Sequence, residues 1–143
     1  MQIRRPLVIA ALTLSVLAPV SACSSSSGSA PTAPASAPST PIKVDPDAWV
    51  QAARSPGTVV IDVRSPEEFA AGHLQGAINM NVEAPDFTQL AAGLDPAVTY
   101  ALYCHSGRRS AIAAAALAQL GVVHVYDLQG GIAEAEAAGM PTA

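Results

Sequence analysis

The sequence predicts an α/β fold, a single doubly wound parallel sheet with helices on both faces. From residue 42 onward, segments typical of strands alternate with segments typical of helices, which is the order found in such sheets. The strand segments are almost wholly apolar and rich in β-branched residues, as in strands covered on both faces, and span 58–63, 98–103 and 122–128. We expect right-handed crossovers, with ligands beyond the carboxyl ends of the strands.

Capping residues and glycines mark the predicted helices. Asp45 and Pro46 form an N-cap followed by proline at the first helical position, and Trp49 is predicted to face the core. Ser65 and Glu68 have the spacing of a capping box. A later helix consists mainly of alanine, so its backbone can lie close to the sheet. The predicted helices cover 46–55, 66–71, 85–94, 110–120 and 132–138.

The first 41 residues are predicted to form an export signal and a tether rather than part of the folded domain. Two arginines precede an apolar stretch at 6–20 that is short for a membrane span and typical of a signal peptide. Residues 20–23, Val-Ser-Ala-Cys, resemble the lipobox of bacterial lipoproteins. We therefore expect a cleaved signal peptide over 1–22, a lipidated Cys23 with a disordered Ser/Pro/Ala tether over 23–41, and a folded domain over 42–143.

From this pattern we predict that the mature protein lies at the bacterial cell membrane, anchored through lipid on Cys23 and facing the periplasm or the cell exterior. The alternative is ordinary signal cleavage that leaves Cys23 as a free thiol. The paired arginines at 4–5 permit twin-arginine export as well as the general secretory route. The sequence does not decide between these routes.

The charge and the composition of the chain limit which ligands and partners it is expected to bind. Loss of the signal arginines takes the formal charge from −4 to −6, and such an acidic chain is not expected to bind nucleic acid. With Cys23 predicted to be lipidated, Cys104 should be a free thiol outside any disulfide. The three histidines lie on different elements and have no metal-ligand spacing, so we expect no bound metal.

The most informative stretch is 103–110, which joins an apolar strand to the alanine-rich helix through a loop that opens with Cys104. Unpaired N–H groups at a helix start stabilise anions and thiolates. Gly107 allows successive N–H groups to face one point, and Arg109 adds a planar set of donors for an oxyanion. We expect a bowl of amides that keeps the Cys104 sulfur ionised and facing solvent. The simpler alternative is a buried cysteine that only fills space.

Four stretches resemble the rhodanese family of sulfurtransferases: VIDVRSPEEF at 60–69, GHLQGAIN at 72–79, CHSGRRS at 104–110 and LQGGI at 128–132. The resemblance implies that Cys104 alternates between thiol and persulfide, with Arg109 as its catalytic partner and with no metal or organic cofactor required. It also implies a small anionic sulfur donor and a thiol or cyanide acceptor, with a protein as a further candidate acceptor. The substrate would be bound by His105, Ser106, Gly107, Arg108 and Arg109.

Other residues of these motifs have simpler interpretations. Asp62 and Arg64 are predicted to support the scaffold as a buried charge pair. Glu68 is interpreted as a capping residue and His73 as a loop residue with backbone partners. His105 could assist a proton transfer or could point to water.

One position departs from the family pattern. The family usually carries a tryptophan three residues after the position of Ile132, where this chain has Ala135. An unfilled space there would cost about 2 to 4 kcal/mol. We predict that Trp49 or another large side chain partly fills it.

Two further functions compete with sulfur transfer. A cell-cycle type of dual-specificity phosphatase or a related arsenate reductase resembles this fold, but its arginine comes six residues after the cysteine and a histidine commonly precedes it. Here Arg109 comes five residues after Cys104, and Tyr103 precedes it. A non-catalytic rhodanese-like module that senses thiols or binds a partner at the cell envelope is the other alternative.

Overall fold

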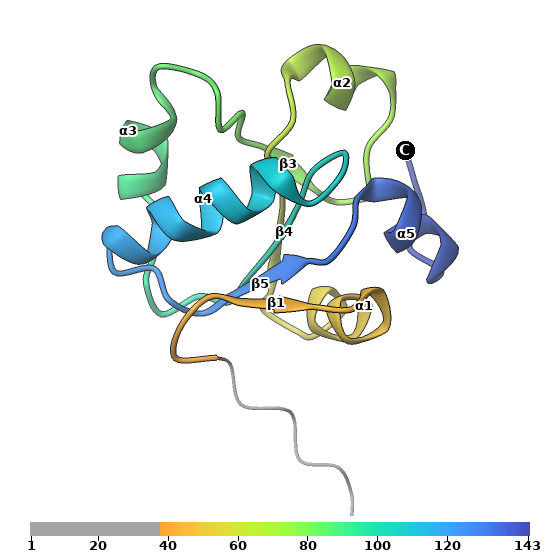
Figure 1. Ribbon diagram of the computed structural model, residues 1–143, viewed down its shortest axis with the longest axis horizontal. Coiled ribbons are helices and arrows are strands. Elements are labelled where there is room, and N and C mark those ends of the chain that lie inside the picture. The colour runs from red at the N-terminus through yellow and green to blue at the C-terminus, as the bar shows by residue number, and fades with distance from the viewer. Residues whose placement is uncertain (1–37) are drawn as a thin grey trace, which may run out of the picture. The chain divides into compact units, whose positions relative to one another are not determined.

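The computed structural model describes residues 38–143, so the predicted signal peptide, Cys23 and most of the predicted tether lie outside the described residues. A five-stranded, all-parallel sheet forms the centre, with strand order β1-β5-β4-β2-β3 (Figure 1). The strands are β1 (Ile42–Val44), β2 (Val59–Asp62), β3 (Ile78–Asn79), β4 (Tyr100–Tyr103) and β5 (Val125–Leu128). The helices are α1 (Pro46–Ala53), α2 (Pro66–Ala71), α3 (Phe87–Ala92), α4 (Arg108–Gln119) and α5 (Ile132–Ala137).

The predicted fold class is confirmed. The sheet contains the three predicted strands and two further ones, β1 and β3. β1 pairs with β5 and β3 pairs with β2, so both lie at the edges of the sheet. β1 has three residues and β3 has two, which is too short to show the apolar or alternating pattern by which a strand is recognised in a sequence. Among the described residues, no helix is both long and apolar enough to cross a membrane.

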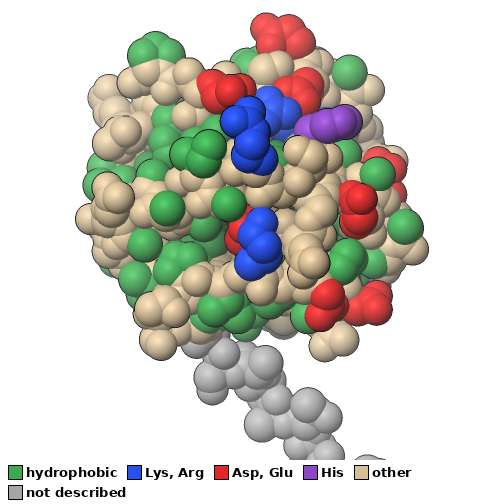
Figure 2. All heavy atoms as spheres, in the orientation of Figure 1, with side chains coloured by type: hydrophobic (Ala, Val, Ile, Leu, Met, Phe, Trp, Pro, Cys, Tyr) green, Lys and Arg blue, Asp and Glu red, His purple; other side chains and the backbone are tan. Residues whose placement is uncertain are grey.

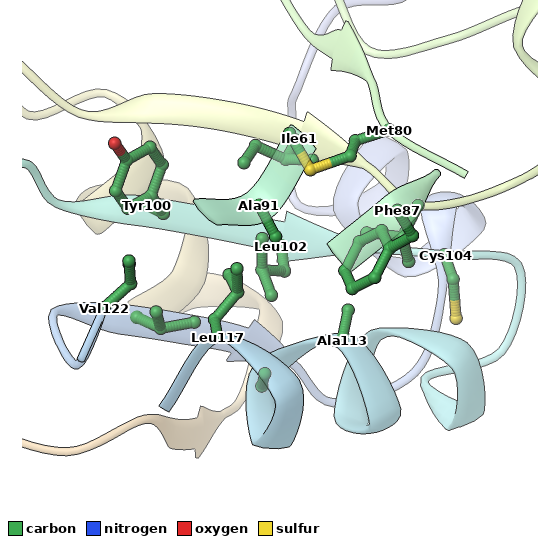
Figure 3. Close-up of a cluster of buried hydrophobic side chains, with 13 residues drawn as sticks. Ile61, Met80, Phe87, Ala91, Tyr100, Leu102, Cys104, Ala113, Leu117 and Val122 are labelled. Carbon is green, nitrogen blue, oxygen red and sulfur yellow. The ribbon is translucent and has the colours of Figure 1, made fainter. Parts of the chain in front are cut away.

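Helices cover the two faces of the sheet, and each face has its own apolar core. Along β4, Leu102 packs with α3 and α4, whereas Ala101 and Tyr103 pack with α1 and α5, because successive strand residues point to opposite faces. Cys104 continues this alternation and belongs to the cluster on the α4 side, which Figure 3 shows in close-up. The position of Cys104 therefore follows from the pleat of the central strand.

Ala135, where the family usually has a tryptophan, lies in a buried apolar cluster that also contains Trp49. Ala135 and Trp49 are both fully buried and belong to the same apolar cluster, in which α1 contacts α5. The indole Nε1–H of Trp49 donates to the Leu102 carbonyl at 3.0 Å, and its ring meets that of Tyr103 edge-on at 6.0 Å. Trp49 is thus the large aromatic side chain that α1 contributes to this cluster, and its filling of the space beside Ala135 stays a prediction.

Caps place the helices close to their predicted bounds. Asp45 accepts from the Ala48 amide, and Ser65 and Glu68 make both bonds of the predicted capping box. α4 begins at Arg108, two residues before the predicted start, and α3 is two residues shorter at each end than predicted. Gly107 completes the loop turn by itself in a left-handed conformation, with φ of 78°, so the following arginines are already helical.

The predicted charge pair between Asp62 and Arg64 is confirmed and lies at the carboxyl end of β2. The Arg64 Nη2 lies 2.6 Å from Asp62 Oδ2, and the guanidinium also donates to the Gly72 carbonyl at 2.7 Å. Its carbon lies 5.7 Å from the centre of the Tyr103 ring. The pair therefore ties β2 to the loop after α2 and to the end of β4.

We predict that Arg64→Met lowers the free energy of unfolding by about 3 to 5 kcal/mol, because it leaves the Asp62 carboxylate buried without its cation. Urea unfolding followed by circular dichroism measures this loss. Arg54→Met is the control, since Arg54 is exposed and donates to the Gly139 carbonyl. It is expected to cost about 1 kcal/mol or less. Equal losses in the two variants would contradict a structural role for the Asp62–Arg64 pair.

Candidate active site

The loop between β4 and α4 wraps the Cys104 sulfur with polar groups. The Gly107 amide donates to Sγ at 3.0 Å, and Ser110 Oγ lies 3.7 Å from the same atom. Figure 3 shows the sulfur pointing from the end of β4 toward the loop that leads into α4. The prediction that loop amides face the sulfur is confirmed for the Gly107 amide. The contribution of the Ser110 hydroxyl was not predicted, and its position six residues after Cys104 is the one signal that could have suggested it.

The predicted exposure of Cys104 is wrong, because the residue has no solvent-exposed surface. It lies beneath its own loop and in the apolar cluster that contains Val63, Phe87 and Ala113. The reason is the register of β4, which directs this residue into the core beside α4 while the loop folds over it. The site therefore combines features of both sequence interpretations: the cysteine is buried, and an amide N–H donates to its sulfur.

Opposing effects set the acidity of the thiol. Burial raises the pKa of Cys104, but hydrogen bonds from the backbone of Ser110, Ser106 and Gly107 and from the Ser110 hydroxyl lower it. The hydrogen bonds prevail, and the pKa of Cys104 lies below its ordinary value. The loop thus favours the thiolate, which is the nucleophilic form of cysteine.

Glycines at 130–131 allow a second loop to support the first. A Cβ built at Gly131 would lie 1.7 Å from the His105 carbonyl oxygen, and one at Gly107 would lie 2.7 Å from the Gly130 oxygen. The Ile132 amide donates to the Cys104 carbonyl at 2.9 Å. Side chains are thus excluded at Gly131 and at Gly107, and Gly130 has a φ of 98°, which favours glycine.

The Arg109 guanidinium faces carboxylates. Its two terminal nitrogens lie 2.7 Å from the two oxygens of Glu68, and Nη1 lies 3.4 Å from Glu83 Oε2. Hydrogen bonding to Arg109 lowers the pKa of Glu68 to about 2, and hydrogen bonding to Glu68 raises that of Arg109. The interpretation of Glu68 as a capping residue is confirmed but incomplete. The pairing was not predicted, because 41 residues separate Glu68 from Arg109.

The other predicted site residues lie around the loop. His105, Ser106 and Arg108 are exposed, whereas Gly107 is buried. Basic side chains lie beside acidic ones and a histidine on the face seen in Figure 2, between α2 and α4. His73 has the expected backbone partners, with Nδ1 3.0 Å from the Phe69 carbonyl. Within residues 38–143, no three His, Cys, Asp or Glu side chains are grouped so that they could hold a metal ion.

The comparison with known families agrees with this geometry. The family model described as "Rhodanese-like domain" matches residues 46–138. The chain belongs to the rhodanese-like family. The match includes every element of the rhodanese-like domain except β1, and it includes the whole cysteine loop.

Similar proteins indicate an enzyme of this family. The rhodanese-like domain is 44% identical over 87 residues to a protein named thiosulfate sulfurtransferase GlpE from Pseudomonas fluorescens, covering 60% of this chain and 77% of that protein. It is 37% identical over 93 residues to a tRNA uridine(34) hydroxylase from Agrobacterium fabrum, covering 62% of this chain but 30% of that protein. These relatives support a rhodanese-family enzyme, with sulfur transfer as its activity at the family level.

A solved structure supports the fold. The rhodanese-like domain of the Alr3790 protein from Anabaena sp. superposes with a TM-score of 0.63 at 27% identity. The superposition covers 71% of this chain and 77% of the Anabaena chain. The parallel sheet and its flanking helices are therefore those of a rhodanese domain.

We predict that Glu68→Gln reduces the loss in the free energy of unfolding that accompanies a fall in pH toward 2. The folded pKa of Glu68, about 2, lies below the value of about 4.3 for an unfolded glutamate, so its contribution is complete above that value and is lost as pH falls toward 2. Since the side chain is about one-third exposed, the contribution is about 1 kcal/mol. Urea unfolding near neutral pH and at low pH measures the difference.

Glu136→Gln is the matched control for this experiment, because Glu136 is exposed on α5 and makes no ion pair among the described residues. Its pH dependence should follow that of the unmodified protein. If Glu68→Gln also follows the unmodified protein across this range, the Arg109–Glu68 pair does not stabilise the fold.

Proposed function

We propose that this protein is a sulfurtransferase that carries sulfane sulfur on Cys104 as a persulfide. The donor is thiosulfate or a similar anion, and the acceptor is a thiol or cyanide. The observation that carries the proposal is the hydrogen bond from the Gly107 amide to the Cys104 sulfur, in a loop where the net effect of the surroundings is to lower the thiol pKa. A relative that bears the name thiosulfate sulfurtransferase supports the choice of donor.

The reaction proceeds by two displacements at sulfur. The Cys104 thiolate attacks the outer sulfur of thiosulfate, the bond between the two donor sulfurs breaks, and its electron pair leaves with sulfite. The acceptor thiolate then attacks the outer sulfur of the Cys104 persulfide, and the cysteine departs as thiolate. Cyanide would take the same sulfur as thiocyanate. Neither step needs an external oxidant or reductant.

The loop supplies electrostatic stabilisation for both displacements. The amides that favour the Cys104 thiolate also favour the anionic persulfide, because both place negative charge at the bottom of the loop. Arg108 and Arg109 supply positive charge for the donor oxyanion, and His105 and Ser106 offer polar groups at the rim. Since Glu68 holds both terminal nitrogens of Arg109, a donor oxyanion has to share or displace that carboxylate.

We also propose that the enzyme acts outside the cytoplasm. The pattern of residues 1–23 supports a cleaved signal and a lipid on Cys23, and the composition of 23–41 supports a tether between the lipid and the domain. Such an arrangement would present the cysteine loop to small donors and to protein acceptors at the membrane surface. Metabolic labelling with a fatty acid, abolished by Cys23→Ser, tests the anchor.

We predict that incubation with thiosulfate adds the mass of one sulfur atom to Cys104, and that Cys104→Ser abolishes both this gain and sulfur transfer to a dithiol or cyanide. Intact-protein and peptide mass spectrometry locate the added sulfur. Cys23→Ser is the matched control and should retain full uptake. An unmodified protein that takes up no sulfur would favour the non-catalytic module, and transfer that persists in Cys104→Ser would exclude the mechanism.

We predict that Arg109→Met selectively weakens reactions with anions. The rate of Cys104 alkylation by anionic iodoacetate relative to neutral iodoacetamide should fall about 3- to 10-fold, because the guanidinium attracts the charged reagent. The ratio cancels any change in the thiolate population, which affects both reagents equally. The kcat/KM for thiosulfate should fall at least as much. An unchanged ratio would remove Arg109 from donor recognition.

A further inference from the structure

A lysine on the edge strand contacts the cysteine loop from outside the active site. Lys43 Nζ lies 3.0 Å from the Gly107 carbonyl oxygen and 3.1 Å from Asp127 Oδ2. Lys43 is on β1 and is the register partner of Asp127 on β5. One ammonium group therefore connects two neighbouring strands to the turn that covers the Cys104 sulfur.

Lys43 binds the carbonyl oxygen of Gly107, the residue whose amide donates to the Cys104 sulfur. Gly107 donates its N–H to Cys104 Sγ and offers its carbonyl to Lys43, so the two contacts hold the two ends of one residue. This residue has a φ of 78°, a region that glycine adopts with little penalty and that leaves the turn little intrinsic rigidity. An external contact on its carbonyl restricts rotation of the turn.

Asp127 is a buried carboxylate with one oxygen that has no hydrogen-bond partner among the described residues, so its burial is energetically unfavourable. The residue is 3% exposed, and its Oδ1 has no hydrogen-bond partner within residues 38–143. A buried carboxylate with an unsatisfied oxygen is destabilising compared with an apolar residue of similar size. Its one ionic contact among the described residues is with Lys43, whose side chain is 44% exposed. The carboxylate thus fixes an otherwise mobile ammonium at the Gly107 carbonyl.

We propose that Lys43, held by Asp127, is a positioning residue that keeps the Gly107 amide directed at the Cys104 sulfur. It acts through the loop backbone rather than on the substrate. The charge of Arg109 does act on the thiol, and Glu68 and Glu83 largely offset that charge. Arg108 is exposed and has no ion pair among the described residues. The charge of Lys43 is itself offset by Asp127, so its effect on the loop is mainly geometric.

The test uses the full chain and follows alkylation of Cys104 by iodoacetamide between about pH 5 and pH 10, with the labelled peptide identified by mass spectrometry. Lys43→Met should move the midpoint of the rate profile upward by about half to one pH unit, which is a loss of about 3- to 10-fold in thiolate below the midpoint. Lys43→Arg, which restores a cation that can reach both oxygens, should recover most of the shift.

Two further variants separate positioning from general destabilisation. Asp127→Asn releases the ammonium without leaving an unpaired carboxylate, and it should shift the midpoint in the same direction even if Lys43→Met folds poorly. Arg54→Met removes another bond from a cation to a glycine carbonyl, the 2.7 Å contact with Gly139, at a site outside the cysteine loop. Its midpoint should equal that of the unmodified protein.

The result that overturns the proposal is an unchanged midpoint in both folded Lys43→Met and Asp127→Asn. A shift of equal size in Arg54→Met would also overturn it, since the effect would then follow stability alone. The relevance of Lys43 to turnover rests on the proposed function, but the midpoint of the alkylation profile reports the titration of the thiol without any turnover. Failure of thiosulfate to load Cys104 would therefore refute sulfur transfer and leave the result on Lys43 intact.

Discussion

The hydrogen bond from the Gly107 amide to the Cys104 sulfur is the interaction on which the site depends. It requires a left-handed residue at the loop apex, and it requires the backbone at 130–131 to approach the loop so closely that no side chain fits between them. Both requirements are met by glycine. The chemistry of a buried thiol is therefore determined here by backbone conformation, with two loops that hold each other in place at the carboxyl end of the sheet.

Charged groups surround this backbone arrangement without touching the sulfur. Glu68, placed by the capping box of α2, holds Arg109 at the start of α4, so a helix cap and a site arginine share one carboxylate. Asp62 and Arg64 brace the end of the neighbouring strand against Tyr103, which directly precedes the cysteine. The charged side chains around the site thus mainly hold the loop and strand ends in position, and the loop amides act on the Cys104 sulfur.

The sequence was sufficient to predict features that depend on local patterns. The apolar β-branched strands, the Ser65–Glu68 capping box and the glycine in the cysteine loop each have a short-range signature, and each is found as predicted. The edge strand β1 and the Arg109–Glu68 and Lys43–Asp127 contacts were not predicted. They depend on which strands become neighbours, and that is decided by topology over separations of tens of residues.

The exposure of Cys104 was predicted wrongly for a related reason. The pattern indicates that a strand ends at Tyr103, but the side on which the next residue lies follows from the register of the whole strand. That register buries the thiol, and burial alone would raise its pKa and make it inert. Because the loop amides and the Ser110 hydroxyl more than offset this cost, the pKa of the buried thiol lies below its ordinary value. A buried thiolate held by oriented amides is less solvated than one in water, and so needs less desolvation before it attacks a donor sulfur.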